Sequence, residues 1–133
     1  MSHFTQVETK INDLVALKSA LVDLGLEYEE ATENQLVTVR GWKGSTLKAE
    51  AKIKGSKSYD IGLQLTEEGN YKLVADWWGI EEETQETQQV ITQRVIQRYA
   101  YHKVKNEVAK QGFQLDEEQV EADGTIKLGV SKW

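Results

Sequence analysis

The sequence predicts an α+β fold, with a mostly antiparallel sheet of about six to eight strands and two helices on one face. Two observations predict it. Near residues 14–24 and 84–111, apolar residues recur every three or four positions, which is typical of helices that bury one side. Across residues 37–78, apolar and polar residues alternate, which is typical of antiparallel strands with one face in water. The order is β-α-β-meander-α-β-β.

The first helix is preceded by a strand, HFTQVETKI. Asn12 is a suitable N-cap for the helix, and Gly25 is a suitable end. The apolar residues between them share one side and predict the face that packs on the sheet: Leu14, Leu17, Ala20, Leu21 and Leu24.

The meander is predicted from four alternating segments, which read LVTVRG, LKAEAKIK, YDIGLQLT and YKLVADWW. Their connections, GWKGST, KGSKS and EEGN, are short enough for hairpins. Trp77 and Trp78 end the last segment. As neighbours on a strand they would face opposite sides, with one of them in the core.

A long helix is predicted from about Thr84 to Gln111, with Gly112 as its end and the polar stretch EEETQETQQ as the loop that leads into it. Its apolar residues fall in three sectors, so we expect the sheet or a second chain to cover it on several sides. A last hairpin follows, in which FQLDEEQV and TIKLGVSKW flank a turn with Asp123-Gly124.

Length and composition predict one globular domain, residues 1–133. Apolar residues make up 39% and charged residues 29% of the chain. The absence of cysteine excludes disulfides, thiolate metal sites and cysteine nucleophiles. Apolar runs are too short for a membrane span, and MSHFTQVETK does not resemble a signal peptide. We therefore expect a soluble protein in a reducing, aqueous compartment such as the cytoplasm.

The net charge of −6 argues against general nucleic-acid affinity, but the charges are unevenly distributed. Residues 40–57 contain six basic residues and one acidic residue, and residues 94–110 contain five and one. Acidic residues gather at 27–33, 81–86 and 116–123. If the two basic segments meet in space, the protein has one basic face; otherwise they are ordinary solvated surfaces.

A basic stripe of Arg94, Arg98 and Lys105, with His102 beside it, is predicted on the long helix from a rotation of about 100° per residue. Arginines four residues apart can bind a carboxylate or a phosphate group. Pairing with acidic residues of the same chain is the alternative. Tyr99 and Tyr101 point to different faces and are expected to be amphipathic core residues.

The glycine-rich turn VRGWKGST is a second candidate surface, in which Arg40 and Lys43 could contact anions and Trp42 could anchor a partner. Its spacing does not match a phosphate-binding loop, because only two residues separate Gly41 and Gly44 and Lys43 precedes the second glycine. An ordinary hairpin turn is the alternative interpretation.

No catalytic residue, cofactor site or metal site is predicted. His3 and His102 are the two histidines, and no metal-ligand spacing or nucleophile motif is present. Tyr101, His102 and Asp60 form the one acid–base set that the sequence allows, with nothing to show that they converge. These observations favour a non-enzymatic protein.

Segments throughout the chain resemble a known family: MSHFTQV, VRGWKG, YDIG, YKLVAD, QRYAYHKVKNEVAKQGF and DGTIKLGVSKW. They are similar to the hypothetical chloroplast reading frame family numbered thirty-five, a domain of unknown function in cyanobacteria and plastids. The resemblance implies a cyanobacterial cytoplasm or a plastid stroma. Members of the family often sit beside a small ferredoxin and a second short unknown protein, an association that hints at an accessory role in photosynthetic electron transfer.

Three functions follow as hypotheses. The first is an accessory protein that docks an acidic partner, such as a ferredoxin, through a basic face made of Arg94, Arg98, His102, Lys105, Arg40, Trp42 and Lys43. The second is a nucleic-acid-binding protein that stacks bases on Trp42, and the third is a small enzyme. A homodimer through the long helix is compatible with the first.

Overall fold

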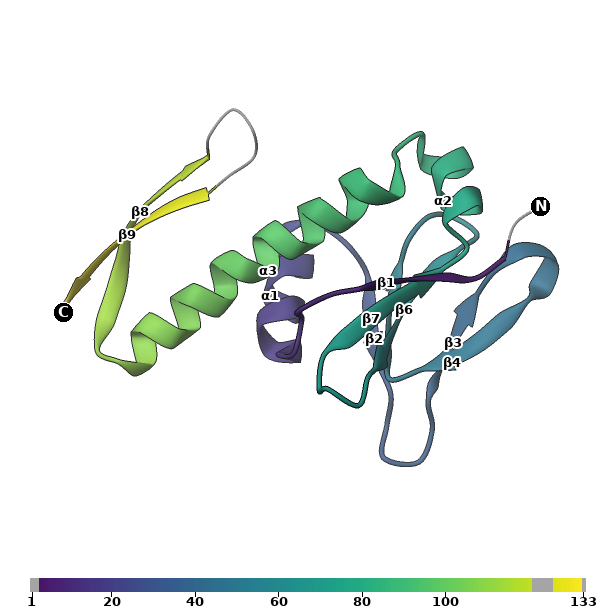
Figure 1. Ribbon diagram of the computed structural model, residues 1–133, viewed down its shortest axis with the longest axis horizontal. Helices are drawn as coiled ribbons and strands as arrows, with labels where there is room; N and C mark the ends of the chain where they lie inside the picture. The colour runs from purple at the N-terminus through teal and green to yellow at the C-terminus, as the bar shows by residue number, and fades with distance from the viewer. Residues whose placement is uncertain (1–2, 121–125, 133) are drawn as a thin grey trace.

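The computed structural model describes residues 3–120 and 126–132 (Figure 1). Within these residues the elements are, in order, β1 (Thr5–Glu8), α1 (Leu14–Asp23), β2 (Tyr28–Glu30), β3 (Val37–Arg40), the 3₁₀ turn η1 (Trp42–Gly44), β4 (Thr46–Ala49), β5 (Ala51–Lys54), β6 (Asp60–Leu65), β7 (Tyr71–Ala75), α2 (Trp77–Thr84), α3 (Gln88–Lys110), β8 (Phe113–Val120) and β9 (Ile126–Lys132). The predicted α+β class is confirmed. No helix in this part of the chain is long and apolar enough to cross a membrane.

The strands form one larger sheet and two ribbons. In the sheet, five antiparallel strands lie in the order β1-β7-β6-β5-β2. β3 pairs with β4 in one ribbon, and β8 pairs with β9 in another, which extends beyond the far end of α3 (Figure 1). The sequence predicted mostly antiparallel strands correctly, but it did not show that the chain distributes them among separate sheets.

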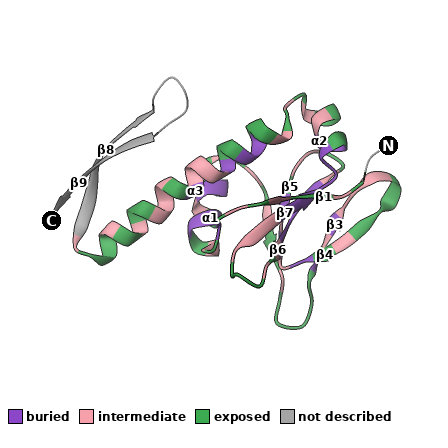
Figure 2. Cartoon of the chain, in the orientation of Figure 1, coloured by how far each residue is buried: buried purple, intermediate pink, exposed green. Residues whose placement is uncertain are grey.

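Helices α1 and α3 cover one face of the five-stranded sheet (Figure 1). The main core lies between the two layers and includes Leu17 and Leu21 of α1, Ile53 and Leu63 of the sheet, and Val95 of α3. Figure 2 shows buried residues in this layer and in the first half of α3, whereas the second half of α3 is intermediate or exposed.

The β3–β4 ribbon covers the opposite face of the sheet. Val37, Val39 and Ala49 of the ribbon form a second, smaller core. Gly62 of β6 lies against this ribbon, and a Cβ atom there would approach Val39 Cγ2 to 2.8 Å and Ala49 Cβ to 3.3 Å. The close approach of the two layers therefore depends on glycine at this position.

β6 is covered on both faces, so the prediction that one of its faces is wet is wrong. Asp60, Ile61, Gly62 and Leu63 are all buried. Alternation of residue types along this strand reflects two different environments, helices on one side and the β3–β4 ribbon on the other. Asp60 consequently lies inside the protein, where a carboxylate needs partners.

The single strand predicted from LKAEAKIK is two strands that belong to different sheets. β4 ends at Ala49, which packs in the smaller core, and β5 begins at Ala51, which packs in the main core. Glu50 holds the bend, because its N–H donates to Leu63 O at 3.1 Å and its Oε2 accepts from Leu65 N at 3.0 Å. The alternation continues through the bend, so the change of sheet left no sign in the sequence.

The strand predicted through Trp78 ends at Ala75, and a short helix follows. Asp76 caps α2 by accepting from Gly79 N at 3.2 Å. Trp77 is 4% exposed and donates to Thr5 O, whereas Trp78 is 53% exposed. One tryptophan is in the core, as expected, although the pair begins a helix. Much of the predicted loop EEETQETQQ is therefore helical.

The end of α1 is predicted correctly and its start is off by one residue. Asp13 is the N-cap, and its Oδ1 accepts from Val15 N at 3.0 Å and from Ala16 N at 3.2 Å. Asn12 instead donates its N–H to Tyr99 Oη. Gly25, at φ 70°, follows the last turn and permits the left-handed conformation that ends the helix.

α3 begins at Gln88 rather than Thr84, because Gln85 adopts φ 62° and separates it from α2. Its fully buried residues are Ile91, Thr92, Val95 and Tyr99, which lie on one side. Val90 and Val104 are exposed by 44% and 40%. In the described part of the chain, the sheet does not wrap the helix as the three apolar sectors had suggested. The predicted last hairpin is β8–β9, and its Asp123-Gly124 turn lies outside the described residues.

Candidate functional site

Tyr101 on α3 is surrounded by three nitrogen-bearing side chains, and the four residues are here named the Tyr101 cluster: Arg98, Tyr101, His102 and Lys105. The Arg98 guanidinium carbon lies 4.2 Å from the centre of the Tyr101 ring, and Lys105 Nζ lies 6.0 Å from it. The His102 ring meets the Tyr101 ring edge-on, with 5.0 Å between centroids. Spacings of three and four residues bring these side chains together on one side of the helix.

Asp23, the last residue of α1, bridges two members of the cluster. Its Oδ2 accepts from Arg98 Nε at 2.6 Å and lies 2.6 Å from His102 Nε2. These hydrogen bonds, from His102 and then Arg98, lower the pKa of the Asp23 carboxyl. A carboxylate at a helix C-terminus is disfavoured by the helix dipole, and the two partners offset that effect.

The start of α1 also contacts α3. Lys103 Nζ lies 3.2 Å from Asp13 Oδ2, and Tyr99 Oη lies 3.1 Å from Asn12 N and 3.2 Å from Asn12 Oδ1. Tyr99 is 7% exposed and Tyr101 is only half-buried. The expectation that the two tyrosines face different sides is confirmed. Contacts at both ends of α1 fix the rotation of α3, and with it the direction of the Tyr101 cluster.

Arg94 lies in the second turn of α3, apart from the Tyr101 cluster. Its guanidinium binds both carboxylate oxygens of Glu86, which raises the pKa of Arg94 and lowers that of Glu86. Arg94 and Lys54 both line a small, largely apolar cavity of about 60 Å³ between the sheet and the two helices α2 and α3. The two basic segments therefore approach each other at this cavity, where each cation already has an acidic partner in Glu86 or Glu27.

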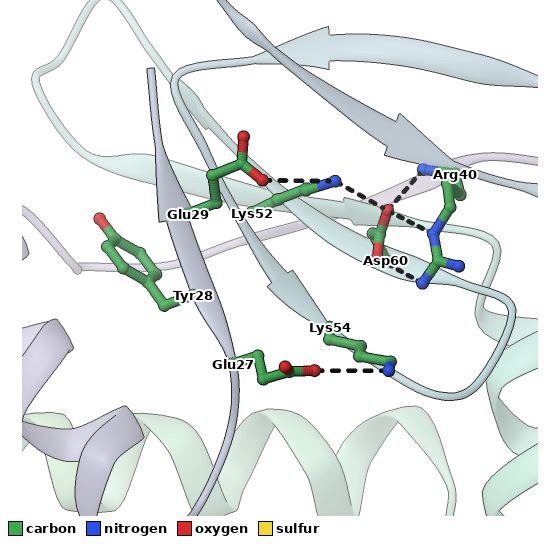
Figure 3. A pocket seen from close by; sticks show the side chains of 7 residues that line it. All are labelled: Glu27, Tyr28, Glu29, Arg40, Lys52, Lys54 and Asp60. Atoms are coloured by element: carbon green, nitrogen blue, oxygen red, sulfur yellow. Dashed lines mark hydrogen bonds and ion pairs between the residues drawn. The ribbon is translucent and has the colours of Figure 1, made fainter. Parts of the chain in front are cut away.

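Arg40 is paired inside a polar cleft on the ribbon side of the sheet (Figure 3). The cleft has a volume of about 390 Å³. Arg40 donates from Nε to Asp60 Oδ2 and from Nη2 to Asp60 Oδ1, each at 2.9 Å, and its backbone N–H donates to Oδ2 at 3.0 Å. Lys52 Nζ donates to Thr38 O at 2.9 Å and lies 3.5 Å from Asp60 Oδ2.

Asp60 is 2% exposed, and its charge is retained by these contacts. Burial alone would raise the pKa of Asp60, but the hydrogen bonds from Arg40 and the charge of Lys52 outweigh it and lower the pKa. Glu29 and Glu27 pair with Lys52 and Lys54 at the mouth of the cleft, at 3.8 Å and 3.4 Å (Figure 3). The arrangement fastens the β3–β4 ribbon to the sheet.

Trp42 and Lys43 lie at the tip of the β3–β4 ribbon, on the other side of the sheet from α1 and α3 (Figure 1). Lys43 adopts the left-handed conformation, with φ 50°, and its Nζ lies 4.5 Å from the centre of the Trp42 ring. The backbone of Gly41 donates to Ser45 O at 2.7 Å and closes the predicted hairpin turn. A cation therefore occupies one face of the indole on which a base would stack.

A family described as "Protein of unknown function (DUF1257)" matches residues 20–129 of the chain. The chain belongs to this family. The uncharacterized protein ycf35 of Cyanophora paradoxa is 35% identical to it, and the match covers 100% of this chain and 98% of that protein. Its counterparts in Pyropia yezoensis and Guillardia theta are 34% and 32% identical over the same shares of the two chains. No solved structure matches.

Within this DUF1257 chain, the predicted binding residues separate into two groups and a single residue, Arg94, which pairs with Glu86. Arg98, His102 and Lys105 lie together on α3, whereas Arg40, Trp42 and Lys43 lie on the ribbon side of the sheet (Figure 1). Tyr101 was missing from the predicted set, although its spacing from Arg98 and Lys105 would have indicated it. The roles of Asp23 and Asp60 depend on contacts between distant segments, which have no local signal.

The acid–base set of the enzyme hypothesis is divided between different places in the fold. Asp60 lines the ribbon-side cleft and is fully engaged by Arg40, and neither Tyr101 nor His102 lines that cleft. His102 contacts Asp23 and Tyr101 instead. Three groups that do not face a common space cannot exchange protons with one substrate.

Proposed function

We propose that this protein is a non-enzymatic binding protein of a cyanobacterial cytoplasm or a plastid stroma. It docks an acidic protein partner, such as a ferredoxin, and serves as an accessory to photosynthetic electron transfer. The relatives, each an uncharacterized protein ycf35, supply no reaction. The proposal rests on the surface chemistry of α3.

The observation that carries the proposal is the Tyr101 cluster. Tyrosine and arginine are enriched among the residues that dominate binding energy at protein interfaces. Tyr101 is half-buried beneath Arg98, so the ring is rigid and part of it faces solvent. Lys105 is exposed, and among the described side chains it forms no ion pair. A rigid aromatic ring next to an unneutralised lysine is suited to a partner that presents carboxylates.

The charge of residues 94–110 also favours an acidic partner. Residues 94–110 contain five basic residues and one acidic residue, although the whole chain has a net charge of −6. An acidic partner is repelled by most of the molecule and attracted to this helix, which orients the encounter. Arg94, Arg40 and Lys52 are less suitable, because they are held by Glu86 and Asp60.

The proposal is tested by calorimetry at low salt, which measures the affinity of a plant-type ferredoxin for the wild-type chain and for Lys105→Glu. We expect Lys105→Glu to weaken binding by about tenfold or more, because attraction becomes repulsion at the contact. Adding salt to about 0.5 M should remove most of the difference, since the Debye length falls to a few ångströms.

Lys48→Glu is the matched control, because it makes the same charge change on the exposed surface of the β3–β4 ribbon, on the other side of the sheet. It should bind within about twofold of wild type at moderate salt. Equal affinities of the wild type and Lys105→Glu, or equal losses in the two variants, would disprove docking at the Tyr101 cluster.

A homodimer through α3 is a second arrangement favoured by the same helix. No α3 residue after Tyr99 is fully buried in the described part, and Val104 is 40% exposed. Such a dimer would cover the apolar sector that the sheet leaves uncovered. Sedimentation equilibrium tests for this dimer at about 100 µM protein, a concentration well above the dissociation constants of typical homodimers. A dimer that Val104→Glu converts to monomer supports this arrangement, and a wild-type monomer refutes it.

A further inference from the structure

The turn between β5 and β6 binds a carboxylate from another element. Ser56 Oγ donates to Glu83 Oε1 at 2.5 Å, and the backbone N–H of Ser58 donates to the same oxygen at 2.9 Å. The hydrogen bonds from Ser56 and Ser58, with the charge of Lys57, lower the pKa of Glu83. A hydroxyl, a backbone amide and a nearby ammonium group together form a typical donor set for an anion.

The backbone of this turn is held in place without the help of Glu83. The N–H groups of Gly55 and Ser56 both donate to Tyr59 O at 3.0 Å, which closes the hairpin. Arg40 Nη1 donates to Lys57 O at 3.2 Å and ties the turn to the β3–β4 ribbon. The receptor is therefore preorganised, and filling it with an anion requires little rearrangement.

Glu83, in contrast, is an exposed residue in the last turn of α2. The rest of α2 is held by apolar contacts, because Ile80 is fully buried and the Tyr59 ring packs closely against Gly79. The bond between Glu83 and the turn can therefore open while the start of α2 stays in place. Exposed charge-assisted contacts of this kind are weak and exchange readily.

We propose that the turn Ser56–Ser58 is a receptor for an oxyanion of another molecule, a carboxylate or a phosphate group. Glu83 is its internal occupant, and an outside oxyanion displaces it. Tethering gives Glu83 an effective concentration on the order of millimolar. A competing group that carries more charge, such as phosphate, can replace it and release the last turn of α2. This inference is independent of the docking proposal, because no member of the Tyr101 cluster takes part.

Inorganic phosphate and acetate are the probes, titrated at constant ionic strength into full-length ¹⁵N-labelled protein. In Glu83→Ala the site is vacant, so the Ser58 amide resonance should shift and saturate with phosphate. Glu82→Ala removes a neighbouring exposed carboxylate that makes no side-chain contact with the turn in the described structure, and it is the matched control. We expect phosphate to bind Glu83→Ala about twofold to fivefold more tightly than Glu82→Ala, because the weak internal competitor is gone.

The two probes distinguish the sources of the oxyanion, since tighter binding of phosphate indicates a phosphate group and tighter binding of acetate indicates a carboxylate. Adding Lys57→Ala to Glu83→Ala should abolish saturation. If the amide spectrum shows that Glu83→Ala is unfolded, Glu83→Gln is used in its place, because the uncharged side-chain amide competes less with an anion than the carboxylate does. An unshifted Ser58 amide in the folded variant, or equal affinities in Glu83→Ala and Glu82→Ala, would overturn the proposal.

Discussion

Tyr99 and Tyr101 are two residues apart on α3 and have different roles. The hydroxyl of Tyr99 joins α3 to Asn12, whereas the ring of Tyr101 supports Arg98 and Lys105 at the surface. The sequence predicted this division, because a helical rotation of about 100° per residue separates the two side chains by more than half a turn. It could not show which tyrosine is buried, since this depends on where α1 packs.

Tyr99→Phe should destabilise the fold by about 1 kcal/mol, because the backbone N–H of Asn12 loses a partly buried acceptor. Thermal unfolding measures it as a decrease in Tm of about 3–5 °C. Tyr101→Phe is the control. It removes the same hydroxyl from a ring whose contacts are made by its π face and edge, so its Tm should stay within about 1 °C of wild type. A larger decrease in Tm for Tyr101→Phe than for Tyr99→Phe would show that the two roles are assigned the wrong way round.

Asp60→Asn should reduce the free energy of unfolding by about 2–3 kcal/mol, because it removes the buried charge that Arg40 binds. Glu29→Gln, which alters the exposed pair with Lys52, should change it by less than about 0.5 kcal/mol. Urea unfolding at neutral pH measures both. The prediction fails if the two variants are equally stable.

Stability should also depend on pH through Asp60. Its pKa is lowered in the folded state from 3.8, so the unfolded chain takes up the proton first as pH falls. The stabilisation is complete well above pH 3.8 and disappears as pH falls through the folded-state pKa. The difference between wild type and Asp60→Asn should therefore shrink below about pH 4. A difference that stays constant to lower pH would show that another interaction is responsible.

At the scale of elements, the alternating strands and both main helices were predictable, but the breaks between elements were not. The chain leaves the β3–β4 ribbon for the five-stranded sheet at Glu50 without interrupting the alternation, because Ala49 and Ala51 are each buried in a different core. Asp76 starts α2 immediately after β7, with no glycine to mark the boundary. Such breaks depend on contacts between layers, which a local pattern does not contain.

The position of α2 depends on the packing of Tyr59 against Gly79. A Cβ atom at Gly79 would lie 2.3 Å from Cζ of the Tyr59 ring, closer than atoms can pack. Gly79→Ala should therefore reduce the free energy of unfolding by about 1–3 kcal/mol. Glu82→Ala on the exposed side of α2 should have little effect. In the double variant Gly79→Ala with Tyr59→Ala, the two losses should be less than additive, and strict additivity in urea unfolding would argue against this contact.

At the scale of the whole molecule, the sheet separates two basic surfaces. The sequence left open whether these surfaces form one continuous face. The Tyr101 cluster lies on α3, and the ribbon tip with Trp42 and Lys43 lies on the other side (Figure 1). Their relation could not be read from the chain, because it depends on the ribbon folding back over β6. Most cations of residues 40–57 that face the sheet are neutralised by Asp60, Glu29 or Glu27. On α3, Arg94, Arg98 and Lys103 are also paired with acidic residues, so the docking proposal rests on Lys105 beside the Tyr101 ring.

The most direct test of docking on α3 is the amide spectrum of ¹⁵N-labelled protein during titration with unlabelled plant-type ferredoxin at low salt. We predict shifts that concentrate on residues 98–105 and that weaken as salt screens the charges. Residues 41–45 at the ribbon tip should remain unchanged. Shifts confined to the ribbon tip, or a spectrum that does not change at all, would contradict the proposal that this protein binds an acidic partner through the Tyr101 cluster.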